Sequence, residues 1–148
     1  DRACADLPAT STPIPAIITF RTETKLSAGN ATPTIYAGLS GQLSAATNGA
    51  DVQTPIPGGE YGNLRCRAST ATGADLTITF QTSTCGSSLS GTNQEVILEN
   101  ADGTNTVIDS TNTQTVSSNA NQCGVFKMVK ASNSYATGFV TCTIERVS

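Results

Sequence analysis

The feature that most constrains the fold is a period-two alternation of apolar and polar residues in short runs. In "DLTITF", the side chains of Leu76, Ile78 and Phe80 fall on one face of an extended chain. Thr77 and Thr79 fall on the opposite face, as in an antiparallel strand with one buried and one solvated side. No segment of ten or more residues shows a helical period. The chain is therefore predicted to be all-β, without substantial helix.

The same pattern recurs along the chain in runs of strand length. The predicted strands cover residues 15–24, 33–39, 62–70, 74–83, 93–99, 104–109, 112–117, 122–131 and 137–147. Residues 122–131 alternate less strictly, which indicates a more central strand. In "NADGTN" at 100–105, Asp-Gly predicts a hairpin, because both turn residues tolerate positive φ. Short strands at this spacing predict an antiparallel β-sandwich.

Length and composition predict one domain of extracellular type. The chain has 148 residues, which is enough to bury a single core without a metal or a partner. Only 13% of the residues are charged, and Ser, Thr, Asn and Gly are abundant, as in β-rich extracellular proteins. We expect an N-terminal arm at 1–12 and a single β-sandwich domain at 13–148. We interpret the start of the arm as a mature N-terminus left after signal-peptide removal.

Several classes of site and partner are excluded by residues that the chain lacks. It contains no histidine, so His-based nucleophilic triads, His general bases and His-containing zinc sites are ruled out. The net charge is −3 and the eight basic residues are thinly spread, so no nucleic acid is expected as a partner. The longest apolar runs, such as "PAIITF", are far shorter than the roughly 18 residues that span a bilayer. We therefore expect no membrane insertion.

Five cysteines without a C-x-x-C spacing favour disulfide bonds, and hence secretion into an oxidising extracellular compartment. Cys123 and Cys142 flank a predicted hairpin whose turn lies near Asn133, so they are expected nearly opposite each other across two strands. We therefore predict a Cys123–Cys142 bridge, and a second bridge between Cys66 and Cys85. Other connectivities stay open, because spacing alone does not determine disulfide pairing.

Two further residues predict covalent links or modifications. Cys4, in the arm, is left over by this pairing, and an odd cysteine in a secreted chain indicates an intermolecular bridge or a free thiol. The alternative is that Cys4 attaches the arm to its own domain. The sequon "NAT" predicts a glycosylation site at Asn30, on an exposed loop, if the source is eukaryotic.

Carboxylates are the remaining candidates for catalysis or metal binding. Glu95 and Glu99 share one face of a predicted strand, but at a rise of roughly 3.3 Å per residue they are about 13 Å apart. That separation exceeds the roughly 5 to 9.5 Å of glycosidase carboxylate pairs. Glu99 and Asp102 resemble a fragment of a calcium loop, but the EF-hand ligand series is absent and a hairpin turn explains them. We expect no catalytic residue, no metal site and no cofactor.

Four side chains are candidates for contact with a partner. Arg65 and Arg67 flank Cys66 on one strand face, where they either bind an anionic partner or keep a solvated face soluble. Tyr61 and Tyr135 lie in predicted loops, and exposed tyrosines are favoured at binding surfaces. The alternative for both tyrosines is packing over the end of a sheet.

Several segments resemble, in order, the elements of a CUB domain. They are "PGGEYGNLRC", "TGADLTITF", the cysteine at 85, "QEVILENADG" and "FKMVKASNSYATGFVTCTI", within roughly residues 40–147. The resemblance implies a β-sandwich of the CUB-like or jelly-roll type, and bridges from Cys66 to an N-terminal cysteine, here Cys4, and from Cys85 to Cys123. The family's Trp after its second cysteine and one of its cysteine positions are missing. "QTST", "NQ" and "KASNS" lack the acidic residues of calcium-binding members, so that site is predicted to be absent.

Two functional hypotheses follow from these features. The first is a secreted, disulfide-stabilised binding module that recognises an extracellular protein or glycan through loops or a sheet face, as the CUB resemblance implies. The second is a structural subunit of an extracellular assembly, linked to copies of itself through the arm by strand exchange or a Cys4 disulfide. An enzyme is the least expected class, because the usual general bases are missing.

Overall fold

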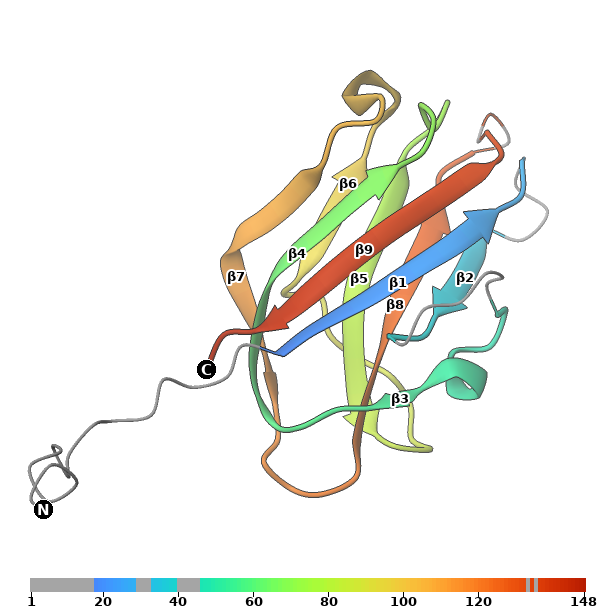
Figure 1. Cartoon of the computed structure of the whole chain (residues 1–148). Helices are drawn as coiled ribbons and strands as arrows, with labels where there is room; N and C mark the ends of the chain where they lie inside the picture. The colour runs from blue at the N-terminus through green and yellow to red at the C-terminus, as the bar shows by residue number, and fades with distance from the viewer. Residues whose placement is uncertain (1–17, 29–32, 40–45, 133, 135) are drawn as a thin grey trace, which may run out of the picture.

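The computed structural model describes residues 18–28, 33–39, 46–132, 134 and 136–148. Its strands form two antiparallel sheets that pack face to face, one in front of the other in Figure 1. Helical structure in the described residues is limited to two short 3-10 segments, η1 (Gly49–Val52) and η2 (Asn100–Asp102). The predicted all-β sandwich is therefore confirmed. Within the same residues, no helix has the length and hydropathy that a membrane span requires.

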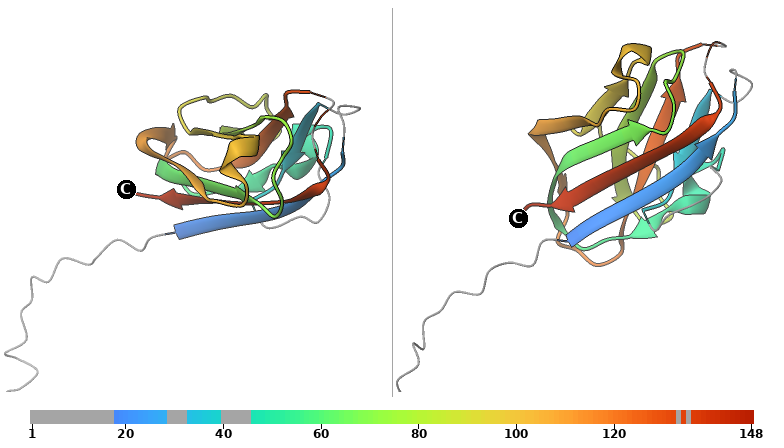
Figure 2. Two further views of the ribbon diagram at one scale, coloured as in Figure 1. Left: turned by 90° about the horizontal axis from the view of Figure 1, so that it is seen from above. Right: turned by 45° about the horizontal axis from the view of Figure 1, so that its top comes forward.

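The two sheets contain strands from all parts of the described chain. Sheet A consists, in spatial order, of β1 (Ile18–Leu26), β9 (Gly138–Arg146), β4 (Gly59–Ala68) and β7 (Val107–Val116). Sheet B consists of β2 (Thr34–Ala37), β8 (Gln122–Lys130), β5 (Leu76–Thr84) and β6 (Glu95–Leu98), with β3 (Thr54–Pro55) also paired to β8. Figure 2 shows these sheets as separate layers. β8 pairs on both of its sides, which confirms its predicted central position.

The predicted hairpin at 100–105 is wrong, because the strands before and after it lie in different sheets. β6 pairs with β5 in sheet B, whereas β7 pairs with β4 in sheet A. Residues Asn100–Asp102 form η2, and Gly103 follows with a φ of 58°. The Asp-Gly pair does supply a tight turn, as its chemistry predicts. Which strands pair is decided by burial of their apolar faces over long range, which turn residues do not encode.

β7 is one strand, although two separate strands at 104–109 and 112–117 were predicted. The break between them is a bulge, where the pairing of β4 with β7 shifts register between Gly62 and Leu64. The fully buried Gln94 side chain fills this irregularity. Its Oε1 accepts a hydrogen bond from the Leu64 backbone N–H at 2.9 Å, and its Nε2 donates to the Asn112 carbonyl. The amide thereby satisfies backbone groups that the bulge leaves without a strand partner.

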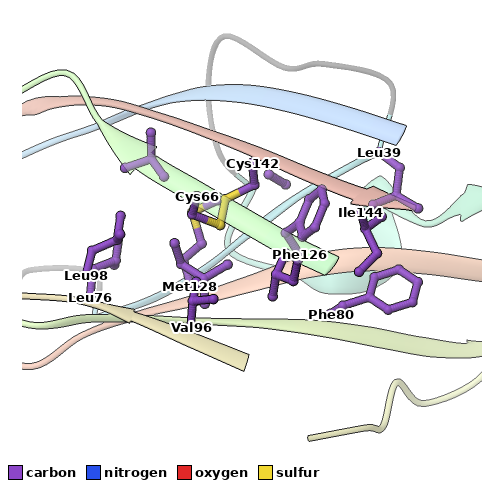
Figure 3. Packing of buried hydrophobic residues seen from close by; sticks show 14 of the residues in the cluster. Leu39, Cys66, Leu76, Phe80, Val96, Leu98, Phe126, Met128, Cys142 and Ile144 are labelled. Atoms are coloured by element: carbon purple, nitrogen blue, oxygen red, sulfur yellow. A yellow bond between two sulfur atoms is a disulfide. The ribbon is translucent and has the colours of Figure 1, made fainter. Parts of the chain in front are cut away.

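Side chains from both sheets meet between the layers in one hydrophobic core, shown in Figure 3. As the alternation predicts, Leu76, Ile78 and Phe80 of β5 are fully buried there. Burial of one such side chain contributes roughly 1.5 to 3 kcal/mol. Tilted aromatic contacts, with ring centroids 5.5 to 6.2 Å apart, link in order Phe20, Tyr61, Phe80 and Phe126.

Two disulfides stabilise the sandwich, but their pairing differs from the prediction. Cys66 of β4 is bonded to Cys142 of β9, directly opposite it in sheet A with a Cα–Cα distance of 4.2 Å. Cys85, just after β5, is bonded to Cys123 of β8 in sheet B, with a Cα–Cα distance of 5.0 Å. The predicted Cys123–Cys142 and Cys66–Cys85 bridges are therefore wrong, because each joins cysteines that belong to different sheets.

The CUB resemblance implied one of these two bridges. The Cys85–Cys123 pairing agrees with it. A bridge from Cys66 to an N-terminal cysteine does not form, because Cys66 is bonded to Cys142. Cys4 itself lies outside the described residues.

Candidate functional site

The outer face of sheet B carries a pocket with a volume of about 380 Å³. This volume lies within the roughly 300 to 1,000 Å³ of small-ligand sites. Strands β2, β5 and β8 form the floor, while the segment around η1 and the turn after β5 form the walls. The described residues that line the pocket are Tyr36, Asn48, Gly49, Ala50, Gln53, Gln81, Gly86, Ser87, Ser88, Leu89 and Lys127. Most of them are polar and uncharged, which suits a polar ligand.

Strand register brings the floor residues together. Tyr36 of β2 is paired with Lys127 of β8, and Lys127 is paired on its other side with Thr79 of β5. Gln81 lies two residues beyond Thr79 and therefore on the same face of β5. The neighbours of Lys127 in sequence, Phe126 and Met128, are buried in the core, so Lys127 faces outward.

The η1 wall approaches the floor closely at a glycine. A Cβ atom added to Gly49 would lie 2.6 Å from Leu89 Cδ1 and 3.0 Å from Tyr36 Cδ1, which is too close for a side chain. Asn48 caps η1, because its Oδ1 accepts a hydrogen bond from the Ala50 N–H at 3.1 Å. The absence of a side chain at Gly49 thus allows both Leu89 and the Tyr36 ring to pack closely against the η1 backbone.

The opposite wall is tied to η1 by one amide side chain. Gln53 Oε1 accepts a hydrogen bond from the Gly86 N–H at 2.6 Å, and Gln53 Nε2 donates to the Ser87 carbonyl at 2.9 Å. The disulfide between Cys85 and Cys123 anchors the start of the same turn to β8. The wall is therefore fixed before any ligand binds, and this lowers the entropic cost of binding.

The charge of the pocket is positive. Lys127 is the one charged side chain among the described lining residues. In the part of the chain that the structure describes, neither its ammonium group nor the Tyr36 hydroxyl has a hydrogen-bond or ion-pair partner. Two carboxylates lie in neighbouring elements, Asp51 in η1 and Glu95 on β6, and neither lines the pocket. Glu95 lies two strands from Lys127 and accepts a hydrogen bond from Thr79 Oγ1 at 3.2 Å.

Tyr61, one of the predicted partner contacts, is buried in the core and cannot reach a partner in this structure. Its hydroxyl donates a hydrogen bond to the Pro57 carbonyl at 2.7 Å, four residues upstream, as in the tyrosine corner of other β-sandwiches. Burial raises the pKa of its phenol, and the charge of Arg146 opposes that rise. The other predicted tyrosine, Tyr135, and the sequon at Asn30 lie outside the described residues.

Arg65 and Arg67 are exposed on the outer face of sheet A, on the opposite side of the molecule from the pocket. Arg65 pairs with Glu145 at 3.4 Å, and Arg67 Nε donates to the Thr104 carbonyl at 3.2 Å. Both arginines line a shallow depression of about 180 Å³. The guanidinium groups thus lie on the flat sheet and already have partners within the chain.

Three other carboxylates, those of Glu99, Asp102 and Asp109, have structural roles. Glu99 and Asp102 form a reciprocal capping box at η2, with the Glu99 N–H donating to Asp102 Oδ2 at 2.7 Å. Burial opposes ionisation of Asp109, but hydrogen bonds from Glu95, Asn112 and Thr111 outweigh it and hold the pKa of Asp109 below its ordinary value. No group of three or more His, Cys, Asp or Glu side chains in the described ranges is placed to hold a metal ion.

Sequence reasoning missed the pocket residues. The position of Lys127 on an outward face was accessible from the sequence, because "VFKMVK" places it between two apolar residues that face the core. Gln53 and Asn48 carried no comparable signal, since their roles depend on the turn after β5 and on η1. Comparison with protein-family models gives no match, and neither do comparisons with curated proteins and with solved structures. The CUB resemblance therefore stays a prediction.

Proposed function

We propose that the protein is a secreted, non-enzymatic binding module that recognises a glycan through the pocket on the outer face of sheet B. The observation that carries this proposal is the combination, around one open, prebuilt pocket, of an aromatic ring, uncharged amides and a cation that has no partner among the described residues. Tyr36 offers a ring on which the apolar face of a sugar can pack. Asn48 Oδ1 already accepts from the Ala50 N–H and Gln81 Nε2 already donates to the Gly91 carbonyl. The Asn48 amide nitrogen can still donate to a sugar hydroxyl, and the Gln81 amide oxygen can still accept from one.

Binding without catalysis is supported by the chemistry of the lining. The described lining residues include no carboxylate and no thiol, and the whole chain has no histidine. Glycoside hydrolysis in most families needs two carboxylates on either side of the scissile bond. The lining groups instead suit hydrogen bonding and packing, which hold a ligand without breaking it.

An extracellular setting is supported by the covalent chemistry of the sandwich. Two disulfides link four of the five cysteines, and such bonds persist in oxidising compartments. The resemblance to CUB domains, whose partners are extracellular proteins or glycans, also supports an extracellular setting.

The two edges of sheet A, β1 and β7, favour a binding module over a subunit that assembles through strand pairing at this sheet. On the β7 edge, the Asp109 carboxylate accepts hydrogen bonds from the backbone N–H groups of Thr111 and Asn112 at the bulge. The β1 edge carries the charged side chains of Arg21, Glu23 and Lys25. Bulges and charges are the devices that natural sheets use against edge pairing. Assembly through the arm and Cys4 involves residues outside those described.

The proposal is tested by screening the protein against an oligosaccharide array and measuring the best binder by calorimetry. Tyr36→Ala should weaken binding about tenfold or more, because the packing surface is lost, whereas Tyr36→Phe keeps the ring and most of the affinity. Phe139→Ala is the matched control, because Phe139 is exposed on the outer face of sheet A. Equal loss in Tyr36→Ala and Phe139→Ala, or binding of an extracellular protein and of no glycan, contradicts the proposal.

A further inference from the structure

We propose that the pocket selects an acidic sugar unit, with the carboxylate or sulfate group of that unit bound at the Lys127 ammonium. This inference rests on the proposed glycan binding and identifies the chemical class of the ligand. It begins from the position of Lys127 in the pocket floor, beside Tyr36 in the register of β2 and β8.

Two neighbouring side chains of the floor carry hydrogen-bond donors. The Lys127 ammonium has three N–H groups and the Tyr36 hydroxyl has one, and none of them has a partner among the described residues. The two side chains extend from paired positions on adjacent strands, whose backbones lie about 4.8 Å apart. An anionic group that carries several acceptor oxygens can therefore bind both donors at once.

The described residues next to Lys127 are uncharged, so its positive charge is available to a ligand. On β8, its outward neighbours two residues away are Val125 and Val129, which are apolar. Across the strands it faces Tyr36 on β2 and Thr79 on β5, which are both neutral. Asp51 and Glu95, the carboxylates of the adjoining elements, do not line the pocket.

A neutral sugar does not suit this floor as well as an acidic one. A ligand that covers Lys127 removes water from the ammonium group, and a desolvated charge without a partner is costly. A carboxylate or sulfate ester on the sugar supplies that partner. Lysine recognises such groups as a point charge and does not require one fixed planar geometry, so both anions fit the same position.

The test uses three oligosaccharides with one common core: a neutral form, a form with a terminal carboxylate-bearing sugar, and a sulfated form. Their binding is measured by calorimetry on the full chain and on Lys127→Gln, Lys127→Arg and Lys25→Gln. Lys25 is the control cation, because it is exposed on β1 in sheet A, away from the pocket.

We expect at least one acidic form to bind about tenfold or more tightly than the neutral form. Lys127→Gln should remove that preference, Lys127→Arg should keep most of it, and Lys25→Gln should leave it unchanged. Raising the salt concentration should weaken binding of the acidic ligand and leave binding of the neutral ligand unchanged.

Three results overturn the inference. If the neutral form binds as tightly as the acidic forms and is sensitive to Tyr36→Ala, the glycan pocket stands and the acidic preference fails. If the acidic preference persists in Lys127→Gln or is lost in Lys25→Gln, the anion binds elsewhere. If none of the three forms binds while an array ligand does, and that ligand is neutral, the proposed function survives without this inference.

Discussion

The outer faces of the two sheets are built from strands with the same alternation, yet within the described residues only the outer face of sheet B is covered by other segments. On sheet A, the outward side chains of β1, β4 and β9 form a flat, exposed surface with Arg21, Arg65 and Arg67. On sheet B, outward residues such as Val125 and Cys123 are buried, with 0% and 2% of their surfaces exposed. The difference arises because η1 and the turn after β5 fold over one end of sheet B. A binding site here is created by what covers a strand face and not by the strands themselves.

Removing a disulfide should have the largest effect of the changes that test this contrast, because each of the two disulfides belongs to one sheet. Replacing either cysteine pair by alanine should cost about 2 to 5 kcal/mol of unfolding free energy. The Cys66–Cys142 bridge closes a separation of 76 residues against 38 for Cys85–Cys123, so its loss should cost about 0.6 kcal/mol more. Denaturant titration measures both costs.

The same variants separate stability from binding. At temperatures where both remain folded, loss of Cys85–Cys123 should weaken glycan binding, because that bridge anchors the pocket wall. Loss of Cys66–Cys142 should leave affinity unchanged. Equal weakening in the two variants would show that Cys85–Cys123 has no specific role in holding the pocket wall.

Gln94→Leu should lower the stability of the sandwich and spare the pocket. The substitution removes two hydrogen bonds at the β4–β7 bulge and leaves the buried Leu64 N–H without a partner. The expected cost is about 1 to 3 kcal/mol in denaturant unfolding. A fall in glycan affinity for the folded variant would refute the separation of the two faces.

Gly49→Ala should have the opposite profile, with a small effect on stability and a clear effect on binding. The new Cβ would force Leu89 and the Tyr36 ring apart, at a cost of about 1 kcal/mol, because the nearest atom ends a flexible side chain. Gly62→Ala in sheet A is the matched control, because its nearest neighbours would lie at ordinary contact distances of 3.5 Å and more. Unchanged glycan affinity in Gly49→Ala would show that Tyr36 is not part of the binding surface.

Arg65→Ala should have the smallest effect. Its ion pair with Glu145 is partly exposed, with 46% and 20% of the two side-chain surfaces accessible, so its loss should cost no more than about 1 kcal/mol. Affinity for the glycan that binds the pocket should not change. A tenfold loss of affinity would instead place the ligand on the outer face of sheet A.

The sequence predicted the strands well and their arrangement poorly, for one physical reason. Alternation is a local property, so the buried faces of Leu76, Ile78 and Phe80 could be identified from "DLTITF" alone. Pairing between strands is a long-range property, and the local turn chemistry around Asp102 and Asn133 indicated hairpins where the chain crosses between sheets. The incorrect Cys123–Cys142 bridge follows from the hairpin assumed near Asn133.

The candidate site was less accessible from the sequence than the fold. Tyr61 was expected in a loop, but β4 begins at Gly59 and directs the ring into the core. The pocket depends on contacts between segments far apart in the chain, such as the hydrogen bonds of Gln53 with Gly86 and Ser87. No local pattern encodes such contacts.

The most direct test of the account is a titration of isotope-labelled protein with the best-binding oligosaccharide, followed by backbone amide chemical shifts. We predict that the shifts concentrate at Tyr36, Lys127 and the residues of 48–53 and 86–89. The outward residues of β1, β4 and β9 should not respond. Shifts confined to Arg65, Arg67 and their neighbours on sheet A would contradict the assignment of the pocket as the binding site.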